Sequence, residues 1–219
     1  MADTGVLVAV LAAGGASRFG GGKLDAMLAG KPVGQWVLDA VEAAGLEPGV
    51  IVVGPQAPQF AADSGWQLLT NPNAAQGLGT SLALAAAHAE GRTLLVLLAD
   101  MPLIDPAHLR ALVGAGPLAA TLYPNGKAGV PALFGPALLA ELAGLTGDAG
   151  AGALLSSRKG VAMFEPLPAM LLDIDRPEDI VRADDLLKPA ETPAPRRVSR
   201  RCGRCVLRAR HRSRSPAHR

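Results

Sequence analysis

The sequence predicts an α/β fold built on a mostly parallel sheet, and three observations lead to that prediction. Short aliphatic and β-branched runs, of the length of buried strands, alternate with segments whose apolar residues recur at helical spacing. Glycine and proline separate most of these segments. With 219 residues, of which 49% are hydrophobic, the chain can bury a large core, which excludes a small disulfide-stapled fold. Strands that alternate with helices in this way are typical of βαβ units.

In the N-terminal half the alternation is regular. Val6–Leu11 is an aliphatic run that ends in glycines, and Thr93–Ala99 is a similar run that stops at Asp100, so both predict buried strands. Val33–Ala44 carries apolar residues at helical spacing and is followed by Gly45, which predicts a helix and its end. The expected order is strand Val6–Leu11, helix Val33–Ala44, strand Val50–Val53, helix Gln56–Asp63, strand Trp66–Leu69, helix Thr80–Glu90, strand Thr93–Ala99 and helix Pro106–Val113.

After Pro117 the pattern changes. Two short apolar runs, Leu118–Tyr123 and Val130–Phe134, flank the turn Pro124–Gly126, so we expect a hairpin or an antiparallel insertion here. A further strand is expected at Met170–Ile174. The remaining expected elements are helices at Pro136–Leu142, Ala149–Ser157 and Pro177–Leu187.

Charge divides the chain near residue 188. Residues 1–188 hold 11 lysines and arginines against 18 aspartates and glutamates, whereas residues 189–219 hold ten arginines and one glutamate. We therefore expect an acidic globular domain at 1–188 and a basic, disordered tail at 189–219. Both cysteines, Cys202 and Cys205, lie in the tail. Alternatives for the tail are a zinc site completed by His211 and His218, a nucleic-acid-binding arm, and the product of a shifted reading frame.

Composition also limits the function classes. Aromatic residues make up only 3% of the chain, which argues against a nucleic-acid reader that stacks bases on aromatic rings. No apolar run approaches the roughly 18 residues of a membrane helix. Val6–Ala16 ends in small residues as a signal peptide core does, but no basic residue precedes it. We expect a cytoplasmic protein with no membrane segment and no nucleic-acid partner except through the tail.

The segment Leu11–Leu24 follows the first expected strand and is the most informative part of the sequence. In open α/β sheets, ligands bind beyond the carboxyl ends of the strands. The segment offers four kinds of group that suit a triphosphate: glycine N–H groups, a hydroxyl, a guanidinium and an ammonium. They come from Gly14, Gly15, Gly20–Gly22, Ser17, Arg18 and Lys23.

Two common phosphate-binding loops do not fit this segment. A Walker A loop needs a glycine where Ser17 stands and a serine or threonine where Leu24 stands. The dinucleotide fingerprint fails as well, because Ser17 takes the place of its second glycine when Gly15 is the first. A flexible glycine-rich connection without function is the remaining alternative, and the two cations inside the segment argue against it.

The segment resembles the signature loop of the molybdenum-cofactor nucleotidyltransferases (the MobA-like NTP transferases), which reads Leu-Ala-(Ala/Gly)-Gly-x-Ser-x-Arg-Met-Gly-x-x-Lys. Four of its positions align when one residue is absorbed before the serine: Gly14, Arg18, Gly20 and Lys23. Further segments resemble this family in the same order along the chain, up to about residue 187. They are Asn71–Leu82, Leu98–Pro102, Gly129–Phe134 with Val130 in place of a histidine, Gly147–Ala151 and Asp173–Asp179.

Carboxylates that suit a metal ion stand out independently of the resemblance. Asp100 ends an apolar strand, so its carboxylate should lie at the edge of the sheet, beside the glycine-rich segment. Mg²⁺ prefers oxygen ligands and usually takes one or two carboxylates together with phosphate oxygens. A turn or N-cap role before Pro102 is the alternative for Asp100. Asp173 and Asp175 follow the last expected strand, and the resemblance implies that Asp175 is the second ligand of Mg²⁺.

The resemblance implies a Rossmann-like three-layer nucleotidyltransferase fold. It also implies a reaction that transfers CMP from CTP to the terminal phosphate of the molybdopterin (molybdenum) cofactor and releases pyrophosphate. A molybdenum hydroxylase or its chaperone would receive the product. The expected catalytic residues are Arg18, Lys23 and Asp100, and the expected acceptor-binding residues are Pro131 and Asp148. The expected nucleotide-binding residues are Leu11, Ala12, Ala13, Gly14, Gly15, Ser17, Lys23, Asn71, Gly77 and Ser81.

Three other functions compete with this one. A guanylyltransferase acting on the same cofactor differs mainly in the base pocket, and Ala13, where that branch usually has glycine, favours cytidine. A sugar-phosphate nucleotidyltransferase shares the loop but recognises a different acceptor. A non-catalytic nucleotide- or cofactor-binding protein is the third alternative, because Val130 and Asp25 depart from the family pattern. His88 and His108 have no partner at metal-ligand spacing, and we expect them to be surface residues without a role.

Overall fold

The computed structural model describes residues 5–15 and 19–188 of the chain. Its strands are β1 (Val6–Leu11), β2 (Met27–Leu28), β3 (Lys31–Pro32), β4 (Val50–Val53), β5 (Gln67–Thr70), β6 (Thr93–Leu98), β7 (Leu118–Leu122), β8 (Ala128–Phe134) and β9 (Ala162–Phe164). Its α-helices are α1 (Val33–Ala43), α2 (Gln59–Asp63), α3 (Leu78–His88), α4 (Pro106–Gly114), α5 (Leu139–Ala143), α6 (Ala151–Ser157) and α7 (Pro177–Leu187). Single 3₁₀ turns are η1 (Ala74–Gln76), η2 (Pro136–Leu138) and η3 (Pro168–Leu171). None of the described helices is long and apolar enough to cross a membrane.

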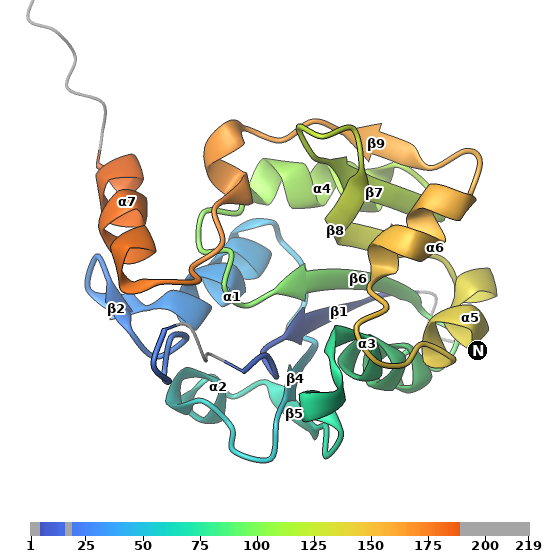
Figure 1. Cartoon of the computed structure of the whole chain (residues 1–219). Helices are drawn as coiled ribbons and strands as arrows, with labels where there is room; N and C mark the ends of the chain where they lie inside the picture. Colours follow the sequence, from blue (N-terminus) through green and yellow to red (C-terminus); the bar gives the residue numbers. More distant parts are fainter. Residues whose placement is uncertain (1–4, 16–18, 189–219) are drawn as a thin grey trace, which may run out of the picture. The chain divides into compact units, whose positions relative to one another are not determined.

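Seven of these strands form one sheet in the order β5-β4-β1-β6-β8-β7-β9 (Figure 1). β5, β4, β1 and β6 run parallel, β8 is antiparallel to both β6 and β7, and β9 is parallel to β7. The prediction of a mostly parallel sheet is therefore confirmed, and β7 with β8 forms the expected antiparallel insertion. β1 and β6 pair from Val6 with Thr93 to Leu11 with Leu98, so their carboxyl ends leave the sheet together.

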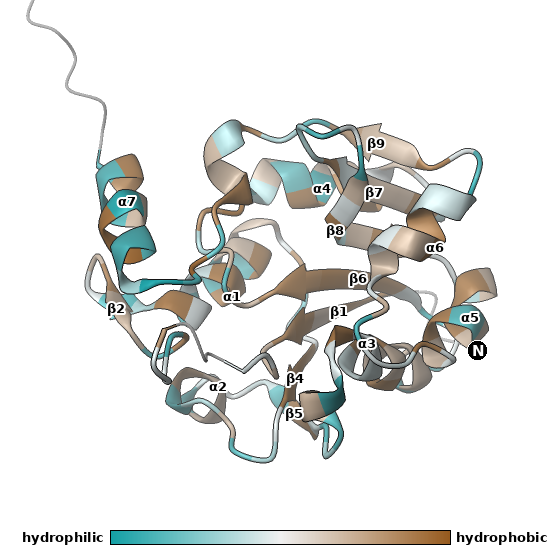
Figure 2. Ribbon diagram, in the orientation of Figure 1, coloured by the Kyte–Doolittle hydropathy of each residue, from teal (hydrophilic) through white to brown (hydrophobic). Residues whose placement is uncertain are grey.

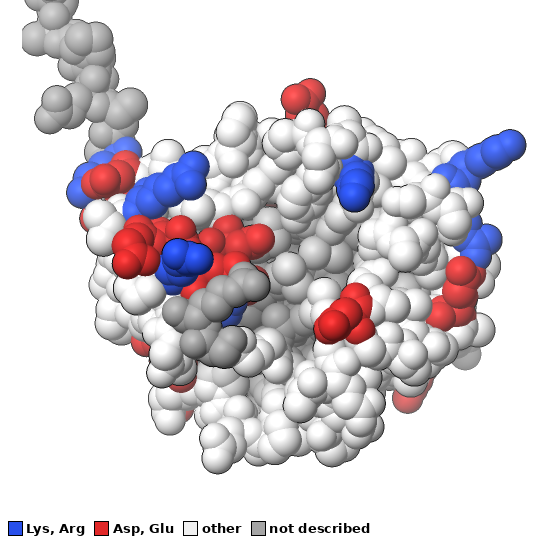
Figure 3. Space-filling view, in the orientation of Figure 1, with Lys and Arg blue, Asp and Glu red and all other residues white. Residues whose placement is uncertain are grey.

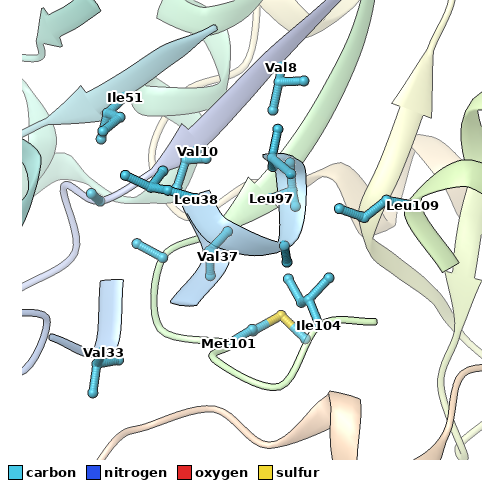
Figure 4. Packing of buried hydrophobic residues seen from close by; sticks show 14 of the residues in the cluster. Val8, Val10, Val33, Val37, Leu38, Ile51, Leu97, Met101, Ile104 and Leu109 are labelled. Carbon is cyan, nitrogen blue, oxygen red and sulfur yellow. The ribbon is translucent and has the colours of Figure 1, made fainter. Parts of the chain in front are cut away.

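Helices cover both faces of the sheet, which gives three layers. Alternate residues of β1 point to opposite faces: Val8 and Val10 pack in a cluster with α1 and α4, whereas Ala9 packs in a second cluster with α3, α5 and α6. Figure 4 shows the first cluster, in which Val37 and Leu38 of α1 lie among strand residues. The strands at the centre of the sheet are hydrophobic along their length (Figure 2), as expected for a sheet buried on both faces.

The expected strand at Met170–Ile174 is wrong. Residues 168–171 form the 3₁₀ turn η3, and β9 at Ala162–Phe164 is the strand that joins the sheet. Met170 and Ile174 are apolar because they close the core, where they are 2% and 0% exposed, and not because they alternate along a strand. Pro168 begins the turn, and the N–H of Ile174 bonds to the carbonyl of Asp100. The short β2–β3 pair was not predicted, because strands of two residues are too short to show an alternation of apolar and polar residues.

Candidate functional site

A cavity of about 450 Å³ lies at the carboxyl ends of β1 and β6. Parallel strands place their carboxyl ends at one edge of the sheet, where open α/β proteins bind their ligands. The cavity is lined by Leu11, Ala12, Ala13, Gly14, Gly15, Lys23, Leu24, Ala74, Ala75, Gly77, Leu78, Ser81, Leu98, Asp100 and Asp148. Figure 3 shows a hollow at the centre of this face, with acidic side chains gathered beside it.

The glycine-rich loop forms one wall of this cavity. Ala12 at its start is held against β4, because its N–H donates to the carbonyl of Val52 at 2.8 Å. Gly20, Gly21 and Gly22 all have positive φ angles, a conformation that side chains other than glycine rarely adopt. A second hollow of about 350 Å³ lies along the same loop and reaches Gly54 and residues 56–58. The predicted contacts of Ser17 and Arg18 lie outside the described residues.

Lys23 joins the loop to two distant carboxylates. Its Nζ atom lies 2.6 Å from Oδ2 of Asp100 and 3.4 Å from Oδ1 of Asp175. Lys23 is only 9% exposed, and burial lowers the pKa of its amine. The two carboxylates outweigh burial and raise that pKa above its ordinary value, so the amine is charged at neutral pH. Sequence reasoning assigned this charge to the triphosphate, whereas in the structure it neutralises the acidic pair.

The chain brings the two predicted metal ligands together. Asp100 follows β6, and the N–H of Ile174 bonds to its carbonyl oxygen at 2.9 Å, which places Asp175 next to it. Their carboxylate oxygens meet at one cation, the amine of Lys23. Two converging carboxylates fit Mg²⁺, which takes one or two of them with phosphate oxygens and water. Among the described residues no group of three or more histidines, cysteines, aspartates or glutamates could hold a metal ion by itself.

Two further ionisable groups stand beside this pair. Burial raises the pKa of Asp173 to about 6, and the negative charges of Asp100 and Asp175 add to the effect. Burial also raises the pKa of Tyr123 to about 12, with smaller contributions from Asp173 and Asp100. The phenol therefore keeps its proton and acts as a hydrogen-bond donor, here to the carbonyl of Val130 at 2.8 Å.

The start of α3 forms the wall opposite the glycine-rich loop. Ser81 lines the cavity, and its Oγ accepts a hydrogen bond from Nδ2 of Asn71 at 2.9 Å. Asn71 does not line the cavity. Both hydrogens of its amide are donated, to Ser81 and to Thr80, and Asn71 is 3% exposed. It therefore reaches the cavity only through the hydroxyl group of Ser81, which keeps its own hydrogen to donate.

Gly77 is required by a close approach to the segment that carries Asp148. Its φ is +121°, and a Cβ atom there would lie 2.4 Å from Oδ1 of Asp148 and 2.5 Å from the backbone of Gly147. The predicted acceptor residue Asp148 thus lines the cavity next to Gly77. Pro131, the other predicted acceptor residue, is buried in β8, and it lines neither the main cavity nor the hollow along the loop.

Two residues, Asp25 and His108, have roles that were not predicted from the sequence. Asp25, which departs from the family pattern, accepts hydrogen bonds from the N–H groups of Gln59 and Phe60 and so caps α2. His108 was expected at the surface, but it is 8% exposed and bonds through Nε2 to Oγ1 of Thr121. Burial lowers the pKa of His108. A carboxylate that caps a helix 34 residues away leaves no local signal.

The solved structures most informative for this chain share its fold over most of their length. Rv0371c from Mycobacterium tuberculosis is 28% identical, with a TM-score of 0.74 over 84% of this chain and 100% of that one. A structure of Rv0371c in complex with manganese matches at 26% identity, with a TM-score of 0.68 over 83% and 99% of the two chains. Mth528, a nucleotidyl transferase from Methanothermobacter, is 26% identical, with a TM-score of 0.70 over 84% and 98%. No curated protein sequence matches the chain significantly.

The sheet order, the cavity and these likenesses define the class: the chain is a nucleotidyltransferase with a Rossmann-like α/β fold. Residues 8–161 match the model of the MobA-like NTP transferase domain. The chain belongs to that family. This confirms the resemblance seen in the sequence.

Proposed function

We propose that the chain transfers CMP from CTP to the terminal phosphate of the molybdopterin cofactor. One observation carries the proposal: Lys23, Asp100 and Asp175, from three distant parts of the chain, meet at the edge of a cavity walled by the glycine-rich loop. That arrangement supplies a cradle for phosphates, a cation and a carboxylate pair in one place. The cytoplasm is the expected compartment, and a molybdenum hydroxylase or its chaperone the expected recipient of the product.

The reaction needs positioning and charge neutralisation more than covalent catalysis. An oxygen of the acceptor phosphate attacks the α-phosphorus of CTP, a new P–O bond forms, and the bond to the β-phosphate breaks to release pyrophosphate. The backbone of Gly14 and Gly15 would hold the triphosphate. Asp100 and Asp175 would hold Mg²⁺, which supplies positive charge for the phosphate oxygens when bound. The ammonium group of Lys23 would then move from the carboxylates to the β- and γ-phosphates and neutralise part of their negative charge.

The choice of CTP is supported by Ala13. This residue lines the cavity, and its methyl group reduces the room for a base. A purine is larger than a pyrimidine and would meet that methyl group first. GTP is the second candidate, since a fold relative from Archaeoglobus fulgidus, 21% identical with a TM-score of 0.62, is described as a molybdopterin-guanine dinucleotide biosynthesis protein A.

The decisive experiment measures pyrophosphate release with each nucleoside triphosphate, Mg²⁺ and molybdopterin. We expect release with CTP and little with GTP. Release with a sugar phosphate and not with molybdopterin would favour a sugar-phosphate nucleotidyltransferase, and nucleotide binding without release would favour a non-catalytic protein.

Ala13→Gly tests how the base is selected. Discrimination by one methyl group is worth about 1–3 kcal/mol, so the ratio of kcat/KM for CTP to that for GTP should fall roughly tenfold. Gly54→Ala is a matched control in the hollow along the loop, where a Cβ atom meets only van der Waals contacts, and the ratio should not change. A wild-type preference for GTP would overturn the cytidylyl assignment.

A further inference from the structure

Strand β8 carries two residues more than its partner at the place where it passes the site. β7 and β8 pair at Ala120 with Ala132, and the next pair is Thr121 with Gly129. Val130 and Pro131 therefore stand outside the ladder and form a bulge, which we call the β8 bulge. Bulges often lie next to active sites, because they redirect a strand and the groups that it presents.

Two side chains, one from β7 and one from the turn after it, donate hydrogen bonds to the carbonyl groups that the bulge leaves unpaired. Oη of Tyr123 donates to the carbonyl of Val130 at 2.8 Å, and Oγ1 of Thr121 donates to the carbonyl of Pro131 at 2.8 Å. Both bulge carbonyls thus point toward β7. An unpaired buried carbonyl is costly, so these two donors hold the bulge in one conformation.

A third residue fixes the orientation of the Thr121 hydroxyl. Nε2 of His108 lies 2.9 Å from Oγ1 of Thr121. Because the hydroxyl gives its one hydrogen to Pro131, it can only accept from His108, so Nε2 must carry a hydrogen. Thr121 is 0% exposed and His108 is 8% exposed, so water does not compete for these bonds.

The bulge lies beside the carboxylates of the site. Pairing between β6 and β8 ends at Val96 with Ala132; β6 then runs on to its end at Leu98, and Asp100 follows. The Tyr123 phenol is within electrostatic reach of Asp173 and Asp100. Its ring occupies the space above Gly129, where a Cβ atom would lie 2.6 Å from Cε2. In the sheet, β8 and β1 lie on opposite sides of β6, so the bulge is on the side of Asp100 away from the glycine-rich loop, which follows β1.

We propose that Tyr123 and Thr121 are positioning residues for an anionic acceptor, namely the phosphate ester that attacks the nucleotide. They turn the two bulge carbonyls away from the site. Carbonyl oxygens carry partial negative charge, and in the free bulge they would repel an acceptor phosphate that already has to approach the acidic pair. With both carbonyls bound, the bulge presents the half-buried side chain of Val130 to the acceptor, while Pro131 stays buried. This inference rests on the proposed function.

The test compares the acceptor with the nucleotide. Tyr123→Phe removes one donor and keeps the ring, and Thr121→Val removes the other and keeps the shape. At saturating CTP and Mg²⁺ we expect either variant to raise KM for molybdopterin about tenfold, the effect of one lost hydrogen bond. The dissociation constant for CTP, measured by calorimetry, should stay within about twofold. Thr121→Ser keeps the hydroxyl and should restore the wild-type KM.

Trp36→Phe is the matched control, because it removes an aromatic N–H donor to the carbonyl of Leu28 outside the site. It should change neither constant. Equal losses for molybdopterin and CTP, or an unchanged KM in both test variants, would overturn the proposal. If Tyr123→Phe does not fold, the comparison of Thr121→Val with Thr121→Ser tests the proposal by itself. A wild type that turns over no nucleotide with molybdopterin is a different result, since it removes the proposed function and the acceptor role with it.

Discussion

The two halves of the cleft are built by different means. The part proposed to bind CTP, which we call the nucleotide half, runs from the glycine-rich loop to the start of α3. It uses the carboxyl ends of parallel strands and main-chain groups, with one buried cation, Lys23. The part beyond Asp100, which we propose binds the acceptor and call the acceptor half, uses antiparallel strands, a bulge and side-chain hydrogen bonds, and it carries Asp173 and Asp175. The geometry of the first half depends on the order of the strands, which single substitutions do not change. The geometry of the second depends on a few individual side chains.

This difference suggests how the halves respond to change. Main-chain groups would hold the phosphates in the proposed reaction, so the nucleotide half should tolerate many side-chain substitutions. A clamped bulge depends on each donor. Substitutions in the acceptor half should therefore affect one substrate, while those in the nucleotide half should act through backbone geometry.

Asp100→Asn should have the largest effect, because Asp100 stands at the boundary and belongs to both halves. It removes a carboxylate from the metal pair and from Lys23, and we expect turnover to fall at least about a hundredfold. Asp184→Asn, an exposed carboxylate on α7, is the control and should keep its turnover. Thermal unfolding of both variants establishes that they fold. Near-wild-type turnover of Asp100→Asn in Mg²⁺ would remove the metal assignment.

Gly77→Ala should have the next largest effect, and Gly116→Ala separates its two causes. Both glycines have positive φ angles, +121° and +105°, so each alanine carries a backbone strain of about 1–2 kcal/mol. Only at position 77 would the added Cβ atom meet Asp148 and the backbone of Gly147. We expect the free energy of unfolding to fall by about 3 kcal/mol or more in Gly77→Ala and clearly less in Gly116→Ala. The free energy of unfolding is measured by urea unfolding. Equal losses in the two variants would mean that the close approach of Asp148 and Gly147 does not contribute to the effect at position 77.

His108→Gln should have the smallest effect, confined to acid pH. Burial lowers the pKa of His108 in the folded state, against the smaller opposing effect of Asp105. The unfolded chain, with an ordinary value near 6.5, then binds a proton more readily than the folded one. Stability is therefore lost as the pH falls through about 6.5 toward the lower folded pKa. Tm should fall less steeply between pH 7.5 and 5.5 in His108→Gln than in the wild type; parallel curves would contradict this.

The sequence predicted which groups gather at the carboxyl edge of the sheet, including the pair Asp100 and Asp175, but it did not predict the hydrogen bonds that hold the β8 bulge. The loop and Asp100 follow strands, and Ser81 lies near the start of α3, so their place at the sheet edge could be predicted from the order of the elements. The roles of Thr121 and Tyr123 depend on a register shift between two strands, and no periodicity reveals such a shift. His108 sits on an amphipathic helix whose facing strand residue is polar, which the pattern of α4 alone does not show.

The contacts of Lys23 also bear on how the protein is made. They join residues 77 and 152 positions apart in the chain, so the ion pairs close very long loops. Such non-local contacts form late in folding. A growing chain that has passed Asp100 already holds the glycine-rich loop and one carboxylate, but it lacks Asp175 until most of the domain has been synthesised. The cleft is thus completed only when its last carboxylate has been made, and in a chain truncated before Asp175 the charge of Lys23 would face Asp100 alone.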